Sequence, residues 1–264
     1  MKKNGVLTTA LAALLVLTAC GAGAQETSSD DYEGIDVASP EWVGKLDVAK
    51  DAEQLFVVAA FSPEATGAWV SLHEKQKDGA WRMVMTTPGF IGKNGLGRTR
   101  EGDMKTPQGV YHFNRAFGIA DDPGSLIPYV KVDDDTYWSG EHWEGGRYNE
   151  LVNAKDFPEI AKRHEDSEHI ADYIYHYQYC LNISYNEKRV PGLGAGIFLH
   201  CIGPARPFTA GCVAIPEDVM KFVMQRVDEK TVVVIDSYEA LSGTDVWPDS
   251  TWPQEVPWQR LRQR

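Results

Sequence analysis

Residues 197–217 read IFLHCIGPARPFTAGCVAIPE, and they indicate the fold and the chemistry more clearly than any other part of the chain. The first five residues are typical of a short buried strand, which carries His200 near its end. Cys212 follows a glycine, and Pro216 marks a typical helix start four residues later. Converging backbone N–H groups at such a place lower the pKa of a thiol and can bind an oxyanion. A nearby histidine could take the thiol proton, as a cysteine nucleophile requires. From these residues alone, a buried core cysteine and an unrelated histidine remain an alternative interpretation.

The rest of the chain has mostly β patterns. Apolar or alternating runs predict strands over 54–61, 68–75, 81–86, 109–116, 171–185, 197–201 and 231–236, and helical spacing predicts a helix over 216–227. The turn at 77–79 predicts a hairpin, and five glycines within 88–102 predict a loop. We therefore expect a mainly β domain with a short helix just after Cys212.

The N-terminal residues have the pattern of an export signal. Lys2 and Lys3 precede the apolar run 5–19, which is too short to span a bilayer comfortably and ends at small residues. Residues 17–20 (LTAC) resemble the bacterial lipobox, in which the cysteine, here Cys20, is lipidated and becomes the mature N-terminus. We therefore expect an exported lipoprotein, anchored by lipid to the outer face of a bacterial membrane in the cell envelope.

Four segments follow from these patterns. Residues 1–19 are predicted to be a lipoprotein signal peptide, and 20–53, rich in Gly, Ser and acidic residues over 21–39, a flexible tether and lead-in. The main domain is expected over 54–236. Residues 237–264 form a Trp- and Pro-rich tail that we expect to wrap the domain rather than to bind glycan.

Charge and cysteine content restrict the partners and the chemistry. The formal net charge is −12 and the chain has no extended basic patch, so nucleic acid is not an expected partner. Besides Cys20, the chain has Cys180, Cys201 and Cys212, and an odd number leaves one thiol free in an oxidising compartment unless chains are cross-linked. A disulfide between Cys180 and Cys201 remains open. Zinc binding by His200, Cys201 and Cys212 would need a fourth ligand, and adjacent residues fit a tetrahedron poorly, so we predict neither metal nor cofactor.

Further motifs resemble a known family. Residues 101–111 (EGDMKTPQGVY), together with His200, a short loop and 209–213 (TAGCV), resemble the L,D-transpeptidase catalytic domain of YkuD type. Residues 148–152 (YNELV) and 184–186 (SYN) are similar to a subgroup of that family. The resemblance covers roughly residues 54–236 and implies a YkuD-like β-sandwich or barrel that acts on peptidoglycan stem peptides.

The resemblance also implies roles for individual residues. Cys212 would be the nucleophile, and His200 its general base and acid. The backbone N–H groups of Gly211 and Cys212 would contribute to the oxyanion hole, and the carbonyl of Cys201 would orient the histidine. Thr209 stands where the family has Ser or Thr, and we expect it to contact substrate.

Two positions depart from the family pattern. Ala210 stands where many members have His, and Ala214 where many have Arg or Asn. A stem peptide ends in carboxylates, which arginine binds well, so Arg206 or Arg98 is expected to replace the missing arginine.

The implied reaction is acyl transfer. Cys212 attacks the third stem residue, a thioester forms, and the amine of a neighbouring stem resolves it. Resolution by water would make the same site an L,D-carboxypeptidase. A non-enzymatic peptidoglycan-binding lipoprotein on a degenerate fold is a further alternative.

Overall fold

The structure is a computed structural model that describes residues 31–204 and 206–245. The predicted signal peptide, Cys20 and the tryptophans of the tail (Trp247, Trp252 and Trp258) lie outside the described residues. The strands are β1 (Val37–Ala38), β2 (Gln54–Ala60), β3 (Gly67–Lys75), β4 (Trp81–Phe90), β5 (Gly109–Gly118), β6 (Tyr129–Lys131), β7 (Thr136–Ser139), β8 (Glu150–Asn153), β9 (Glu168–His169), β10 (Cys180–Ile183), β11 (Phe198–Cys201), β12 (Val213–Ile215) and β13 (Val232–Ser237). The helices are α1 (Glu41–Lys45), α2 (Glu217–Met224) and α3 (Tyr238–Ser242), with 3₁₀ turns η1 (Asp47–Lys50) and η2 (Ile170–Asp172). Among the described residues, none of these helices has the length and apolar character needed to cross a membrane.

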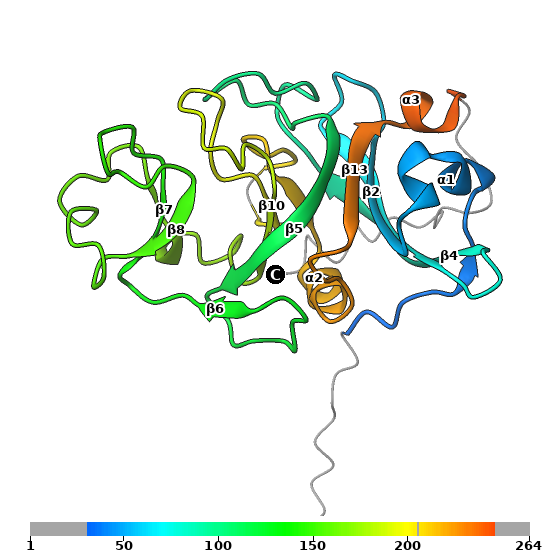
Figure 1. Ribbon diagram of the computed structural model, residues 1–264, viewed down its shortest axis with the longest axis horizontal. Helices are drawn as coiled ribbons and strands as arrows, with labels where there is room; N and C mark the ends of the chain where they lie inside the picture. The colour runs from blue at the N-terminus through cyan, green and yellow to red at the C-terminus, as the bar shows by residue number, and fades with distance from the viewer. Residues whose placement is uncertain (1–30, 205, 246–264) are drawn as a thin grey trace, which may run out of the picture. The chain divides into compact units, whose positions relative to one another are not determined.

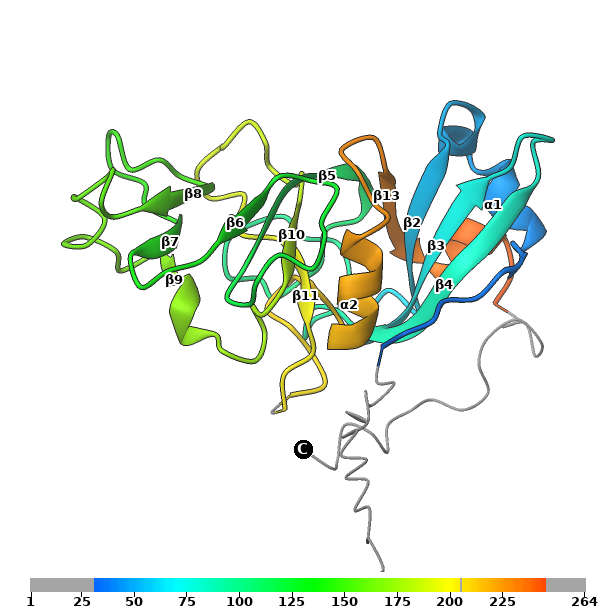
Figure 2. The same ribbon diagram turned by 90° about the horizontal axis from the view of Figure 1, so that it is seen from below.

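Eight strands close into a mixed barrel (Figures 1 and 2). Their order is β4-β12-β11-β10-β5-β13-β2-β3, and the ring closes because β3 also pairs with β4. The pairs β11–β12 and β13–β2 are parallel, and the other pairs of the ring are antiparallel. Closure pairs the strand edges that an open sheet would expose. The expected mainly β fold with a short helix after Cys212 is confirmed.

The interior of the barrel holds the main core. Inward-facing apolar side chains alternate with outward-facing ones along each strand, as the pleat requires. The inward set includes Phe56, Val58, Leu72, Met85, Phe113, Leu181, Ile183, Leu199, Val213 and Ile235, all buried. Helix α2 packs Val219, Met220 and Val223 into the same cluster. Strands β11 and β12 are therefore held by packing on their inner faces.

Two further layers cover parts of the outer barrel surface. The segment with α1, η1 and α3 packs on the outer faces of β2 and β13 through residues such as Val43, Ala49 and Tyr238. On the opposite side, the small sheet β8-β7-β9 lies beyond β5 and β10 (Figure 2). The outer faces of β10 and β11 pack there against Trp138 and Ile170. The layer on β10 and β11 also contains Cys212, so it forms one wall of the site.

Two sequence expectations differ from the structure. The predicted long strand over 171–185 is wrong, because only β10 is a strand there. The alternating aromatic residues before it lie in a loop that follows η2, where Tyr173, Ile174 and Tyr175 are exposed. The expected tether also contains a short strand within its described part. β1 pairs with Arg82 and Met83 of β4, and β12 pairs with β4 only at Phe90.

Candidate active site

Parallel pairing of β11 and β12 brings the two predicted reactive residues to one side of the barrel. His200 lies opposite Ala214 in the register, and Cys212 directly precedes β12. Cys212 joins the cluster on the outer face of the barrel, and it keeps 8% of its surface exposed. The nucleophile candidate is thus mostly buried but not sealed from solvent.

Backbone groups at the start of β11 hold the thiol. The N–H of Phe198 donates to Cys212 Sγ at 3.3 Å, and the thiol donates to the carbonyl oxygen of Gly196 at 3.3 Å. Phe198 is the first residue of the barrel strand β11, and Gly196 lies in the loop just before it. The sulfur therefore has a defined position in the resting protein.

The imidazole of His200 is oriented from its Nδ1 side. Nδ1 lies 2.8 Å from the carbonyl oxygen of Cys201, which accepts the hydrogen bond when Nδ1 carries the proton. Nε2 is then the unprotonated nitrogen, as a general base requires. The ring packs edge-on against Tyr177, with centroids 5.5 Å apart. The contacts described for His200 and Cys212 include no direct hydrogen bond between imidazole and thiol.

Burial makes both groups neutral at rest. Burial, followed by the charge of Glu168, raises the pKa of the Cys212 thiol to about 12, although the Phe198 N–H and Arg98 act in the opposite direction. Burial lowers the pKa of His200 to about 4. The expected lowering of the thiol pKa by a helix start is not found, because β12 separates Cys212 from α2. A thiol beside a neutral imidazole is therefore the resting state.

Two threonine hydroxyls brace the Gly-Cys peptide. Thr209 Oγ1 donates to the carbonyl oxygen of Cys212 at 2.7 Å and accepts the N–H of Gly211 at 3.1 Å. Thr106 Oγ1 donates to the Gly211 carbonyl oxygen at 2.8 Å and accepts the N–H of Gly92. Thr209 was expected to contact substrate and Gly211 to donate into an oxyanion hole, but the structure commits both groups to this internal brace.

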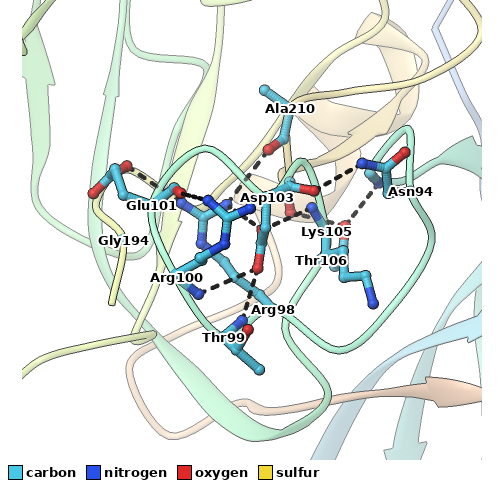
Figure 3. A network of polar contacts seen from close by, with 12 residues as sticks. Asn94, Arg98, Thr99, Arg100, Glu101, Asp103, Lys105, Thr106, Gly194 and Ala210 are labelled. Carbon is cyan, nitrogen blue, oxygen red and sulfur yellow. Dashed lines mark hydrogen bonds and ion pairs between the residues drawn. The ribbon is translucent and has the colours of Figure 1, made fainter. Parts of the chain in front are cut away.

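Arg98 lies beneath the same loop (Figure 3). Its side chain is only 4% exposed and contacts Glu101 at 3.4 Å and Asp103 at 3.5 Å. It also donates to the carbonyl oxygen of Ala210 at 3.4 Å. A Cβ on Gly211 would lie 2.8 Å from this guanidinium, so glycine is needed there for close packing as well as for its φ of +142°. Arg98 therefore reaches the loop, but acidic partners already neutralise it.

The acidic motif forms the other half of this network. Asp103 accepts the backbone N–H groups of Thr99, Arg100 and Lys105 (Figure 3). Burial raises the pKa of Asp103, but these hydrogen bonds and Arg98 outweigh it and hold the pKa below its usual value. The EGD motif thus shapes the loop under the nucleophile.

Sequence reasoning noted 148–152 but did not give Tyr148 or Asn149 a role. Tyr148 donates to Glu101 at 2.7 Å and accepts the N–H of Gly194. Asn149 has a φ of +57°, and its Oδ1 accepts the N–H of Gly196, the residue whose carbonyl holds the thiol. Left-handed backbone is unusual outside glycine, and asparagine tolerates it best. The YNELV segment at 148–152, which Tyr148 and Asn149 open, is the sequence signal that could have pointed to these two residues as part of the site.

Comparison with known proteins agrees with this geometry. Residues 68–235 match the model of the YkuD family, the L,D-transpeptidase catalytic domain. The chain belongs to the YkuD family. This family acts on peptidoglycan, and its reaction therefore takes place in the cell envelope. A search of curated proteins finds no match.

Three solved structures are among those similar to this YkuD chain. The helical cell shape determining protein Pgp2 from Campylobacter jejuni is 18% identical with a TM-score of 0.37, and the match covers 74% of this chain and 54% of that one. The Ldtfm–avibactam carbamoyl enzyme is 15% identical with a TM-score of 0.31, over 70% and 49%. The L,D-transpeptidase (Yku) from Stackebrandtia nassauensis is 14% identical with a TM-score of 0.30, over 74% and 63%. The match thus spans about half to three-fifths of those chains.

The remaining predicted residues of the YkuD domain are also placed. Arg206 is exposed, and its charge contributes to lowering the pKa of His176, after burial. Cys180, Cys201 and Cys212 are free thiols. Cys180 lies opposite His200 in the register, so the following residue of β11, Cys201, faces the other side of the sheet. A Cys180–Cys201 disulfide does not form because the two side chains belong to different clusters.

Proposed function

We propose that this YkuD domain is a cysteine-dependent L,D-transpeptidase that acts on peptidoglycan stem peptides through a thioester at Cys212. The observation that carries the proposal is the arrangement around the thiol. The Phe198 N–H and the Gly196 carbonyl form hydrogen bonds with the sulfur. His200 lies near the end of β11, the strand that Phe198 begins, and its Nδ1 contacts the carbonyl oxygen of Cys201.

The resting protonation states suggest how acylation begins. His200 Nε2 takes the thiol proton as the sulfur attacks the stem-peptide carbonyl, and the Cys201 carbonyl stabilises the imidazolium through Nδ1–H. Because Thr209 already uses the Gly211 N–H, the N–H of Cys212 is the donor we assign to the developing oxyanion. The leaving amine of the terminal D-amino acid then takes the proton from His200.

The donor carboxylate needs a basic partner. Arg98 is nearly buried and contacts Glu101 and Asp103, so its charge is already balanced. Arg206 is exposed beside the His176–His200 side of the site, and we assign it to the donor carboxylate. Thr209 acts by positioning the nucleophile loop rather than by contacting substrate.

The location is part of the proposal. Residues 1–19 act as a lipoprotein signal peptide, and lipid on Cys20 anchors the mature protein to the outer face of a bacterial membrane. The proposal rests on the LTAC motif at 17–20 and on the site of the family's reaction in the cell envelope.

Two measurements test the activity. The purified protein is incubated with a carbapenem, which acylates active cysteines of this family, and the adduct is located by mass spectrometry. We expect one adduct on Cys212; a folded protein without an adduct would support a non-enzymatic binding role instead. Incubation with isolated peptidoglycan followed by muropeptide digestion then separates the two enzymatic outcomes. Dimers cross-linked between third residues indicate transpeptidation, whereas trimmed tripeptides alone indicate an L,D-carboxypeptidase.

A further inference from the structure

Glu168 carries a carboxyl group that the acylation chemistry does not use. It begins β9, opposite Trp138 of β7, in the small sheet outside the barrel. Tyr177 donates to its Oε2 at 2.6 Å. Among the ion pairs found in residues 31–204 and 206–245, none involves Glu168. A partly buried carboxylate without a cationic partner is costly, so a ligand that supplies the cation would gain from binding there.

This carboxyl group is connected to the reactive residues through Tyr177. The ring of Tyr177, which holds it, packs against His200 with centroids 5.5 Å apart and against Phe198 at 5.6 Å. Phe198 in turn donates its N–H to the Cys212 thiol. After burial, the charge of Glu168 is the largest influence that raises the pKa of Cys212. Tyr177 therefore separates the carboxyl group from His200, and Tyr177 and Phe198 together connect it with Cys212.

The surroundings suit an ammonium group. Tyr173 stacks on Tyr177 with centroids 4.6 Å apart and is 37% exposed, so an aromatic ring forms an accessible border of the site. After burial, the charge of Glu168 is the next cause that raises the pKa of Tyr173. A carboxylate beside an aromatic ring attracts cations through charge and through the ring quadrupole. Glu168 is itself partly exposed, which allows a ligand to reach it.

We propose that Glu168, bordered by Tyr173, binds the primary ammonium group of the acceptor stem peptide next to the Cys212 thioester. The inference rests on the proposed function, because it concerns the second half of the same reaction. It makes Glu168 a catalytic residue that favours amines over water.

The proton balance of the second half-reaction follows. The ammonium group gives one proton to the Glu168 carboxylate, and the free amine attacks the thioester carbonyl. The C–N bond forms, and a second proton passes from nitrogen to His200 Nε2. The C–S bond breaks, the thiolate takes the proton from His200, and Glu168 releases its proton to solvent. Burial raises the pKa of Glu168, which makes its carboxylate a better proton acceptor for this role.

The test separates acylation from aminolysis. Wild type and Glu168→Gln are acylated with a donor tetrapeptide, and the thioester is resolved with either of two probes. Methylamine is a cation at neutral pH, whereas hydroxylamine is largely neutral. We expect Glu168→Gln to form the thioester no more slowly than the wild type, because the carboxylate it loses raises the pKa of Cys212, and to keep resolution by hydroxylamine and water. Its resolution by methylamine should fall at least about tenfold, the scale of a charge-assisted hydrogen bond. Glu165→Gln, an exposed carboxyl in the same segment, is the matched control and should leave the ratio unchanged.

The outcomes distinguish this inference from the proposed function. An unchanged methylamine-to-hydroxylamine ratio in an acylated Glu168→Gln protein overturns the role of Glu168 alone. Failure of the wild-type protein to form a Cys212 thioester overturns both. If Glu168→Gln does not fold, Glu168→Asp is used instead. It keeps the negative charge but moves it back toward the backbone, and the inference then requires a lower methylamine-to-hydroxylamine ratio. Tyr177→Phe, which removes the hydrogen-bond donor but keeps the carboxylate, must retain the preference for methylamine.

Discussion

The side-chain Oδ1 of Asn149 accepts a 3.0 Å hydrogen bond from the N–H of Gly196, and the carbonyl oxygen of the same glycine accepts a hydrogen bond from the Cys212 thiol. One glycine residue thus connects a loop near β8 with the candidate nucleophile. The amide of Asn149 also donates to the carbonyl oxygens of Tyr185 and Asn186. The side chain therefore joins two loops at the position where the sulfur is held.

Replacing Asn149 should misplace the thiol. Asn149→Gly keeps a residue that accepts the φ of +57° but removes the hydrogen bonds. We expect carbapenem acylation to slow about tenfold and the free energy of unfolding to fall by about 1–3 kcal/mol, because Gly196 and Trp138 lose a partner. Arg147→Gly has a similar φ and an exposed side chain, so it is the control. Equal slowing in both variants would show that backbone flexibility, not the amide, is responsible.

The roles of the cysteines and His200 can be separated by acylation rates. Cys212→Ser should abolish the carbapenem adduct, because a hydroxyl is much harder to deprotonate than a thiol. His200→Ala should slow acylation by about 100-fold or more, the usual contribution of a general base. Cys201→Ser should have little effect, since only the backbone carbonyl of this residue contacts the imidazole. Loss of the adduct in Cys201→Ser with retention in Cys212→Ser would identify a different nucleophile.

The pH dependence should reflect a neutral resting pair. Because the pKa of His200 is lowered to about 4 and that of Cys212 is raised to about 12, the same protonation state persists between these values. We expect the acylation rate to be nearly constant from about pH 5 to about pH 9 and to fall as His200 is protonated near pH 4. A thiolate–imidazolium pair would produce a bell-shaped profile with its limbs inside this range, and stopped-flow rates across the range decide between them.

Buried histidines should also make folding sensitive to acid. Burial lowers the pKa of His73 to about 3, while its ring nitrogens contact Ser39 and Ser71. Below the unfolded value of 6.5, the unfolded chain binds a proton that the folded chain does not. The free energy of unfolding should therefore fall as pH drops from about 6.5 toward 4, by up to about 3 kcal/mol per buried histidine. Urea titrations should show a shallower fall for His73→Gln and an unchanged one for His112→Gln, whose side chain is 42% exposed.

Removing Arg98 should destabilise the loop that carries Cys212 and the acidic residues beneath it. Arg98→Met leaves Asp103 and Glu101 without their cation, and breaking such a nearly buried pair costs about 3 kcal/mol of stability. Acylation should slow as well, because Arg98 acts to lower the pKa of Cys212 and contacts the Ala210 carbonyl. Arg100→Met, at an exposed neighbouring position, is the control for chemical denaturation and acylation. Wild-type stability in Arg98→Met would contradict the assigned network.

Lipidation can be tested in a bacterial host. Cys20→Ala should leave an unprocessed precursor, because no thiol remains for lipid attachment and the cleavage that follows it. Fractionation and intact mass report membrane retention and processing, with Cys180→Ala as the control. Normal processing and membrane retention of Cys20→Ala would contradict the lipoprotein assignment.

Local sequence patterns were sufficient for the class of fold and for the order of the motifs. The runs that became β2 and β13 can be recognised without their neighbours, because burial on both sides of these strands favours consecutive apolar residues, and the pattern that became β3 is an alternating one. The pairing of His200 with Gly-Cys212, and the EGDMKTPQG and YNELV segments, also pointed to the family from residue order alone.

Tertiary structure decided what those residues do. Strand β12 is only three residues long, so its existence depends on pairing with β11 and β4, and this pairing separates Cys212 from the helix start. The protonation states of Cys212 and His200 follow from burial, which depends on how distant segments pack. Asn149 and Glu168 approach the thiol from loops and strands far away in the chain. Local patterns carry no information about such contacts, because desolvation and long-range hydrogen bonds exist only once the chain has closed into a barrel.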